Sequence, residues 1–202
     1  MSEGEKSVWI KKDIFVKYLE KTTKHDDIFL TFDDGNISDY EIAFSELVSR
    51  NITGKFFIAT DFIDKNNYLS KSNIKELVKY GMVIGTHGKA HVSWRGLCER
   101  FLDDEILHSK KKLEKIINTE VNIAACPFGQ YDSLVLKKLK SYNFKSIYTS
   151  DGIPSTMDSL VQPRYSIKND DDAEIIEKII NQKLMSCDTL LRKVKILLKS
   201  IR

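Results

Sequence analysis

The sequence predicts an α/β protein built on a parallel β-sheet that is either open or closed into a barrel. Short apolar runs alternate with segments of helical periodicity along most of the chain, and the connections between them are a few residues long. Such alternation favours parallel strands joined by right-handed crossovers. The 202 residues are enough for one such domain and few for two, so we expect a single domain over residues 1–202.

Each element has its own signal. Apolar, β-favouring runs closed by polar or turn residues predict the strands, and apolar residues on one face predict the helices. Ser38 with Glu41 forms a capping-box pattern, and Gly81 marks a helix end. The expected strands are 27–32, 54–60, 82–88, 121–129 and 146–152, and the expected helices are 11–24, 38–51, 70–81, 99–118 and 133–144.

Composition and charge exclude several classes of protein. A hydrophobic share of 42% with 30% charged residues is typical of an ordered globular chain. A formal charge of +3 is too small by itself to indicate nucleic-acid binding, which needs clustered basic residues. The basic excess lies at 190–202, where apolar residues recur at helical spacing. This segment is expected to pack on the domain as a helix, with peripheral contact to anionic lipid as the alternative.

The chain is expected to be cytoplasmic. Its first residues are charged and lack the continuous apolar stretch of a signal peptide. Cys98, Cys126 and Cys187 are odd in number and far apart. Neither a disulfide framework nor a structural zinc ribbon is therefore indicated.

Acidic and imidazole side chains follow two of the predicted strands. Asp33 and Asp34 end the strand 27–32, and His87 and His91 follow the strand 82–88. The carboxyl ends of parallel strands share one face of the domain, where ligands bind. One helical turn after the strand would point both imidazoles the same way. Two nitrogens and one carboxylate oxygen then leave an open position, as in catalytic zinc sites.

Simpler interpretations exist for each motif. Asp-Asp-Gly after a strand is common turn chemistry, and two histidines four apart are often surface or core residues. Pro-Phe-Gly at 127–129 is an ordinary turn sequence, and Trp94 and Tyr131 are more typical of packing than of substrate contact. His25 and His108 lie in charged segments and are expected to be solvated. The two metal-ligand motifs strengthen each other because the fold brings them together.

The sequence resembles the polysaccharide deacetylases, the NodB-homology domain of carbohydrate esterases. The motifs Thr-Phe-Asp-Asp-Gly at 31–35, His-x-x-x-His at 87–91 and Pro-Phe-Gly-x-Tyr at 127–131 occur in the family's order and spacing. The resemblance runs from about 27 to 169 and leaves 170–202 as a basic helical extension. It implies a distorted (β/α) barrel of about seven parallel strands, and its third motif is similar to the poly-N-acetylglucosamine deacetylase branch.

The resemblance also implies roles for individual residues. Asp33 is the expected general base. The expected ligands of a divalent ion, usually Zn²⁺, are Asp34, His87 and His91. The backbone N–H of Phe128 is expected to stabilise the oxyanion, and Pro127 and Tyr131 are expected to line the substrate site.

Two positions depart from the family pattern. Many members carry an arginine two residues before the proline of the third motif, where it orients the base, and this chain has Ala125. The family also supplies a late histidine that protonates the leaving amine, whereas residues 160–170 contain no histidine. Tyr165 or a water molecule is the candidate substitute.

The resulting hypothesis is a hydrolase that removes an N-acetyl group from an amino sugar in a polysaccharide or its nucleotide- or lipid-linked precursor, in surface polysaccharide biosynthesis. One alternative is a non-catalytic homologue that binds a sugar or a partner and has lost the general acid. Another is hydrolysis of a different acyl bond by the same chemistry. The expected partner is a carbohydrate, with no role for nucleic acid.

Overall fold

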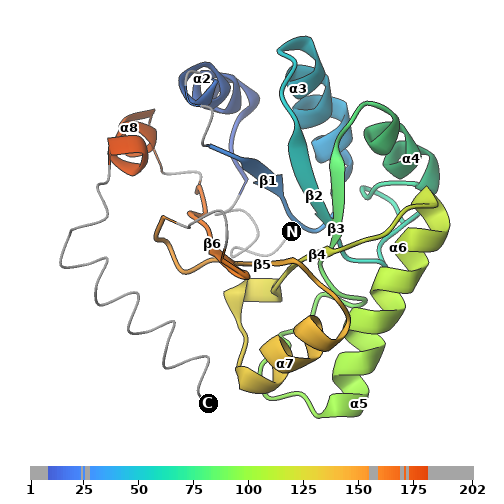
Figure 1. Ribbon diagram of the computed structural model, residues 1–202. Coiled ribbons are helices and arrows are strands. Elements are labelled where there is room, and N and C mark those ends of the chain that lie inside the picture. Colours follow the sequence, from blue (N-terminus) through green and yellow to red (C-terminus); the bar gives the residue numbers. More distant parts are fainter. Residues whose placement is uncertain are drawn as a thin grey trace.

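Six parallel strands form one curled sheet in sequence order. The computed structural model describes residues 9–23, 25, 28–154, 159–168, 171 and 173–181. The strands are β1 (Leu30–Phe32), β2 (Gly54–Ile58), β3 (Val83–Thr86), β4 (Ile123–Ala125), β5 (Ser146–Thr149) and β6 (Val161–Pro163), and the helices surround them (Figure 1). Within the described ranges β1 and β6 are the two sheet edges. The predicted barrel-like α/β fold is confirmed as a half-barrel, with six strands where about seven were expected.

The helices form where the sequence supplies caps and apolar faces. Ser70 and Asn73 form a capping box at the start of α4, and Asp132 caps α7. The helix expected over 99–118 is continuous from α5 to α6 and ends at Asn118 in the left-handed conformation. The elements are α2 (Lys12–Thr22), η1 (Asp39–Phe44), α3 (Ser45–Ser49), α4 (Lys71–Lys79), α5 (Glu99–Leu102), η2 (Asp103–His108), α6 (Ser109–Ile117), η3 (Pro127–Gly129), α7 (Ser133–Ser141) and α8 (Ala173–Asn181).

The capping box predicted at Ser38 is wrong. Ser38 already has helical angles, φ −62° and ψ −25°, and its side chain makes no capping bond. The carboxylate of Asp39 instead accepts from the N–H of Asn36, at 3.0 Å. The helical segment therefore begins before Ser38, and a different acidic side chain closes the preceding turn.

The strands alternate between two apolar layers. Phe56, Ala124 and Ile147 belong to the large core between sheet and helices. Their strand neighbours Phe57, Ile123, Ala125 and Tyr148 form a separate small cluster on the inner side of the half-barrel. Period-two alternation produces these layers. A Cβ on Gly85 would lie 2.4 Å from the Phe57 ring, so only glycine fits the inner face there.

Strand β6 was missed because Pro163 interrupts the pattern. Proline lacks the N–H that a central strand needs but is tolerated at a sheet edge, which is where β6 lies.

Beyond β6, the helix α8 packs beside α2, and Lys21 forms a 2.6 Å ion pair with Glu177. The predicted basic segment 190–202 lies outside the described residues. Among the described helices, none has the length and apolar character needed to cross a membrane.

Candidate metal centre and general base

The aspartate pair lies in a tight turn after β1. Asp34 and Gly35 both have positive φ, 75° and 80°, and the Gly35 carbonyl accepts from the N–H of Leu69 at 2.9 Å. A Cβ at Gly35 would lie 3.1 Å from the side chain of Ile58. Glycine therefore lets the turn lie against β2, and the left-handed backbone at Asp34 directs its side chain differently from that of Asp33.

His87 follows β3 and is fixed by the strands on both sides of it. It is 2% exposed, its N–H donates to Ile58 O at 3.0 Å, and its Nδ1 lies 2.9 Å from the carbonyl oxygen of Ala125. A carbonyl can only accept, so Nδ1 carries the proton. The lone pair of the neutral ring is then on Nε2, the atom that points to Asp34.

His91 reaches the same place by a different route from the one predicted. The helical turn expected between His87 and His91 is absent, because this segment is an irregular loop and His91 has φ 56°. The buried carboxylate of Glu105 shapes the loop. It accepts from the N–H groups of Lys89 and Ala90 at 3.0 and 3.1 Å. Sequence analysis missed Glu105, since nothing in the helical pattern of 99–118 distinguishes its role.

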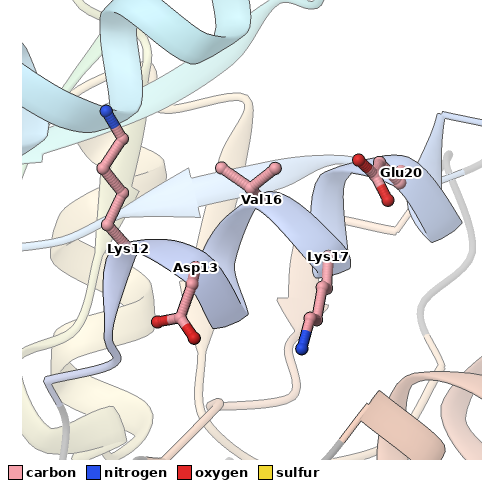
Figure 2. A pocket seen from close by; sticks show the side chains of 5 residues that line it. All are labelled: Lys12, Asp13, Val16, Lys17 and Glu20. Atoms are coloured by element: carbon pink, nitrogen blue, oxygen red, sulfur yellow. The ribbon is translucent and has the colours of Figure 1, made fainter.

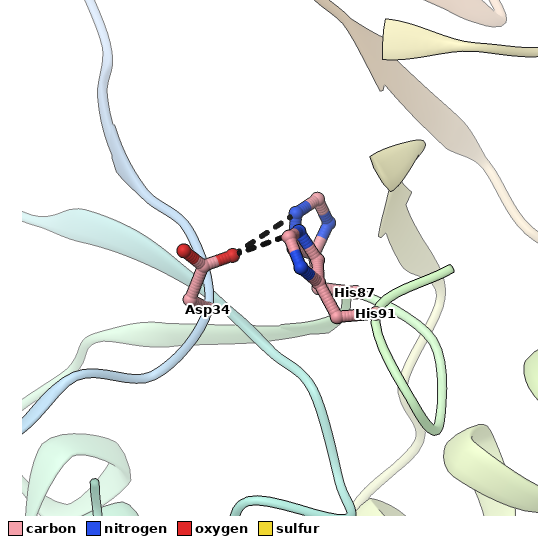
Figure 3. Close-up of side chains that lie close together, drawn as sticks. All are labelled: Asp34, His87 and His91. Atoms are coloured by element: carbon pink, nitrogen blue, oxygen red, sulfur yellow. Dashed lines mark ion pairs between the residues drawn. The ribbon is translucent and has the colours of Figure 1, made fainter. Parts of the chain in front are cut away.

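The structure brings the three predicted metal ligands together. Oδ1 of Asp34 lies 3.1 Å from Nε2 of His91 and 3.4 Å from Nε2 of His87, and the three candidate ligand atoms lie within 4.8 Å of one another. Figure 3 shows both imidazoles directed at one carboxylate oxygen. Burial is the largest of the effects on the pKa of His91; it lowers this pKa and favours the neutral ring. Two imidazole lone pairs and a carboxylate facing one point form a donor set that fits a divalent cation.

Asp33 lies beside this triad but is bound to an arginine. Arg164, just after β6, donates from Nη1 to Oδ1 and from Nη2 to Oδ2 of Asp33, both at 2.8 Å. Burial alone would raise the pKa of Asp33, but the guanidinium charge lowers it to about 2. Asp33 is thus held ionised, as a base requires. Sequence analysis did not identify Arg164, although it noted that Ala125 occupies the position of the arginine expected there.

The third motif places an exposed ring beside His91. Phe128 has φ 57°, its side chain is 62% exposed, and its ring centroid lies 4.7 Å from that of His91. The turn is closed by N–H bonds from Gly129 to Cys126 and from Gln130 to Pro127. The N–H of Phe128 takes no part in these two bonds.

The two residues predicted to bind substrate are buried. Pro127 is covered, and Tyr131 is 0% exposed. The Tyr131 hydroxyl lies 3.2 Å from the carboxylate of Asp151, and burial raises its pKa. Their roles in substrate binding stay predictions. In the structure both residues support the turn that carries Phe128 and do not face solvent.

Other polar and aromatic candidates are not part of the triad. Trp94 is fully buried, as the packing interpretation predicts. His108 is exposed and pairs with Asp104 at 2.8 Å. A separate pocket on α2 is lined by residues of that helix alone, Lys12, Asp13, Val16, Lys17 and Glu20 (Figure 2). None of these five side chains belongs to the triad.

Comparisons with known proteins point to one family. The family model "Polysaccharide deacetylase" matches residues 20–147. "Putative polysaccharide deacetylase YxkH" of Bacillus subtilis (strain 168) is 24% identical over 124 residues, covering 61% of this chain and 44% of that protein. "Peptidoglycan-N-acetylglucosamine deacetylase" of Bacillus cereus is 27% identical over 124 residues, covering 61% and 56%. The chain thus spans about half the length of these relatives.

The fold is shared with solved structures. The deacetylase PplD of Streptococcus pyogenes, solved in complex with acetate, superposes with a TM-score of 0.80 at 21% identity. The superposition covers 90% of this chain and 93% of that one. At this level of identity the likeness concerns the fold.

Proposed function

Because the chain belongs to the polysaccharide deacetylase family, we propose that it is a metal-dependent hydrolase that removes the acetyl group from an N-acetylated amino sugar. One observation carries the proposal. Asp33 is held ionised outside a cluster of Asp34, His87 and His91 whose ligand atoms lie within 4.8 Å of one another. A base beside a three-ligand metal site is the arrangement that amide hydrolysis by activated water requires.

The side chains divide the reaction between them. A divalent ion held by Asp34, His87 and His91 would polarise the acetyl carbonyl and acidify water. Oδ2 of Asp33 faces these ligands, 3.9 Å from Nε2 of His87. Asp33 therefore takes a proton from the water while the water oxygen forms a bond to the acetyl carbon. The carbonyl oxygen gains negative charge in the same step.

The N–H of Phe128 is the proposed donor to that oxygen. The contact between the Phe128 ring and His91 supports this assignment, because it brings the residue next to a proposed metal ligand. A preorganised backbone donor of this kind contributes about 10²–10³ in rate. The left-handed conformation of Phe128 is costly for a non-glycine residue, and such strain recurs at functional turns.

The leaving nitrogen must also gain a proton. The described residues that follow β5 include no histidine. We assign this second transfer to Asp33, which returns the proton it took from water as the C–N bond breaks. Acetate and a free amine are the products. Without a dedicated acid the enzyme should be slow, since such a group contributes about 10²–10⁴ in rate.

An amino sugar fits the rim of the site. The exposed ring of Phe128 and the partly covered ring of Phe62 flank His91, with ring centroids 4.7 and 6.4 Å from that of His91. Aromatic faces bind the apolar faces of sugar rings while polar groups orient the substituents. We propose a polysaccharide or its nucleotide- or lipid-linked precursor as the substrate, in surface polysaccharide biosynthesis.

The test is product release by the purified protein loaded with Zn²⁺ or Co²⁺. N-acetylglucosamine oligomers and nucleotide- and lipid-linked N-acetylated sugars are supplied, and acetate and free amine are measured. We expect equal amounts of both products and a loss of at least about 10²-fold in the Asp33→Asn variant. Acetate release from O-acetyl esters alone would instead assign the protein to ester hydrolysis.

The absent histidine also favours a second candidate, a non-catalytic homologue that binds sugar through the same cluster. In that case metal and sugar bind, but product release from every substrate is no higher than that of Asp33→Asn. Sugar binding is measured by calorimetry on the metal-loaded protein. The two functions therefore differ in turnover and not in binding.

A further inference from the structure

Arg164 crosses the open side of the half-barrel. It follows the edge strand β6, yet its guanidinium donates to Asp33 just beyond the opposite edge strand β1, and Nη1 also donates to Oγ1 of Thr31 at 2.8 Å. Thr31 and Asp33 are two apart, so a strand places them on the same inner face. One side chain thus links β1 and β6, the two sheet edges of the described residues, at the end where the metal ligands lie.

The guanidinium is fixed on every side. Its Nε donates to the carbonyl of Thr149 at 3.3 Å, and its Cζ lies 5.3 and 5.8 Å from the ring centroids of Phe57 and Tyr148. The main chain of Arg164 also donates to Thr149 O at 3.0 Å. The side chain is 13% exposed. A planar cation held in this way imposes its own geometry on the carboxylate that it binds.

Two adjacent carboxylates pose a chemical problem at a metal site. Asp33 and Asp34 carry the same ligand group, and Oδ2 of Asp33 lies 3.9 Å from Nε2 of His87, close to the cluster. Only Asp34 belongs to the group of ligand atoms that converge. The difference is that Arg164 engages both oxygens of Asp33, whereas Asp34 faces the imidazoles.

We propose that Arg164 is a positioning residue that assigns the roles within the Asp33–Asp34 pair by holding Asp33 out of the metal's coordination shell. The inference rests on the proposed metal-dependent function. Without the guanidinium, Asp33 is free to turn toward the cation and become a fourth protein ligand. That ligand would fill the open position that catalytic sites keep for water or substrate, and it would remove the base.

The variant Arg164→Gln tests this by kinetics and by the properties of the bound metal. We expect kcat to fall by about 10²-fold or more with a KM near that of the wild type, because the base is misplaced while the binding surface stays. We also expect metal affinity to be unchanged or higher. The visible spectrum of the Co²⁺ form should change, because an additional carboxylate replaces a solvent ligand.

A double variant isolates the cause of the spectral change. If Asp33 is the added ligand, Arg164→Gln combined with Asp33→Asn restores the Co²⁺ spectrum of the wild type. Arg50→Gln is the matched control, since Arg50 pairs with Glu46 on the surface of a helix and should alter neither readout. Arg164→Lys keeps the positive charge but cannot donate two parallel hydrogen bonds to the carboxylate. Its kcat and Co²⁺ spectrum should therefore lie between those of the wild type and of Arg164→Gln. This variant carries the same test if the glutamine variant does not fold.

An Arg164 variant with the Co²⁺ spectrum and kcat of the wild type would overturn the proposal. So would a spectral change that persists when Asp33 is also replaced. If the wild type releases no acetate from any substrate, the proposed activity fails. The spectra of the single and double variants still decide the role of Arg164 in that case.

Discussion

Oδ1 of Asp34 and Nε2 of His91 lie 3.1 Å apart, and the same oxygen lies 3.4 Å from Nε2 of His87. The proton of His87 is on Nδ1, where Ala125 accepts it, so a lone pair of His87 faces a carboxylate. When His87 is neutral, this contact between its lone pair and the carboxylate is repulsive. A bound cation removes the repulsion, and metal binding should therefore stabilise the fold.

The first prediction is that Zn²⁺ at 100 times its Kd stabilises the wild type by about 2.7 kcal/mol, which for a domain of this size raises Tm by about 5 °C or more. Asp34→Asn should abolish most of this increase. Asp13→Asn, an exposed change on α2, is the control and should keep it. Thermal melts with Zn²⁺ and with EDTA measure the difference. Equal shifts in both variants would show that the ion binds elsewhere.

The second prediction concerns Glu105, which holds the loop of His91 through the N–H groups of Lys89 and Ala90. Glu105→Ala should lower the metal affinity about 10–100-fold, as the loss of outer support does at other metal sites. Isothermal titration with Zn²⁺ measures the affinity. Asp104→Asn is the neighbouring control, because Asp104 binds only side chains, those of Lys89 and His108. An unchanged Kd in Glu105→Ala would mean that the loop keeps its shape without the carboxylate.

The meeting of the acidic and imidazole motifs could be predicted from sequence because each follows a strand, and parallel strands bring their ends to one face. Asp34 and His87 are examples, and their meeting needed only the order of strands and helices. The choice of Asp34 over Asp33 as the ligand came only from the family resemblance. The conformation of the loop before His91 could not be predicted, since it depends on Glu105, whose helix shows only ordinary amphipathic spacing. Left-handed backbone at a histidine has no sequence signal of its own.

Arg164 escaped prediction for a related reason. It lies 131 residues from Asp33 and follows β6, an edge strand that Pro163 disguises. The sequence shows that Ala125 stands where many family members have an arginine. That Arg164 contacts Asp33 instead depends on how far the sheet curls, because the curvature determines whether the two sheet edges approach each other. That curvature is a property of the packed sheet and not of any one segment.

The third prediction follows from Asp103, which joins η2 to α7. Hydrogen bonds from Tyr142 and then from Lys138 lower the pKa of Asp103 below its ordinary value. A carboxyl with a lowered folded-state pKa stabilises the fold above its unfolded pKa, and this stabilisation is lost as the pH falls through the folded value. Asp103→Asn should therefore have a lower Tm than the wild type at pH 7.

The two proteins should converge in acid, at a pH below the folded-state pKa of Asp103. Melts of both proteins across the pH range measure the convergence. Lys168→Gln is a control, because the Lys168 side chain is exposed and forms none of these bonds. A Tm difference between Asp103→Asn and wild type that is the same at every pH would contradict the electrostatic origin, since it would then reflect packing alone.

The fourth prediction separates the side chain of Phe128 from its backbone. Phe128→Ala keeps the N–H that is proposed to bind the oxyanion and removes an exposed ring beside His91. KM should rise about 10-fold, because an aromatic contact with the substrate contributes about 0.5–1.5 kcal/mol in addition to the effect of the apolar area that it buries. The change in kcat should be smaller. Phe101→Ala is the matched control, since Phe101 is 61% exposed on α5 and far from the turn in sequence. Steady-state kinetics on an N-acetylglucosamine oligomer give both constants. A large fall in kcat with unchanged KM would mean that the ring sets the backbone geometry of the turn and does not bind the sugar.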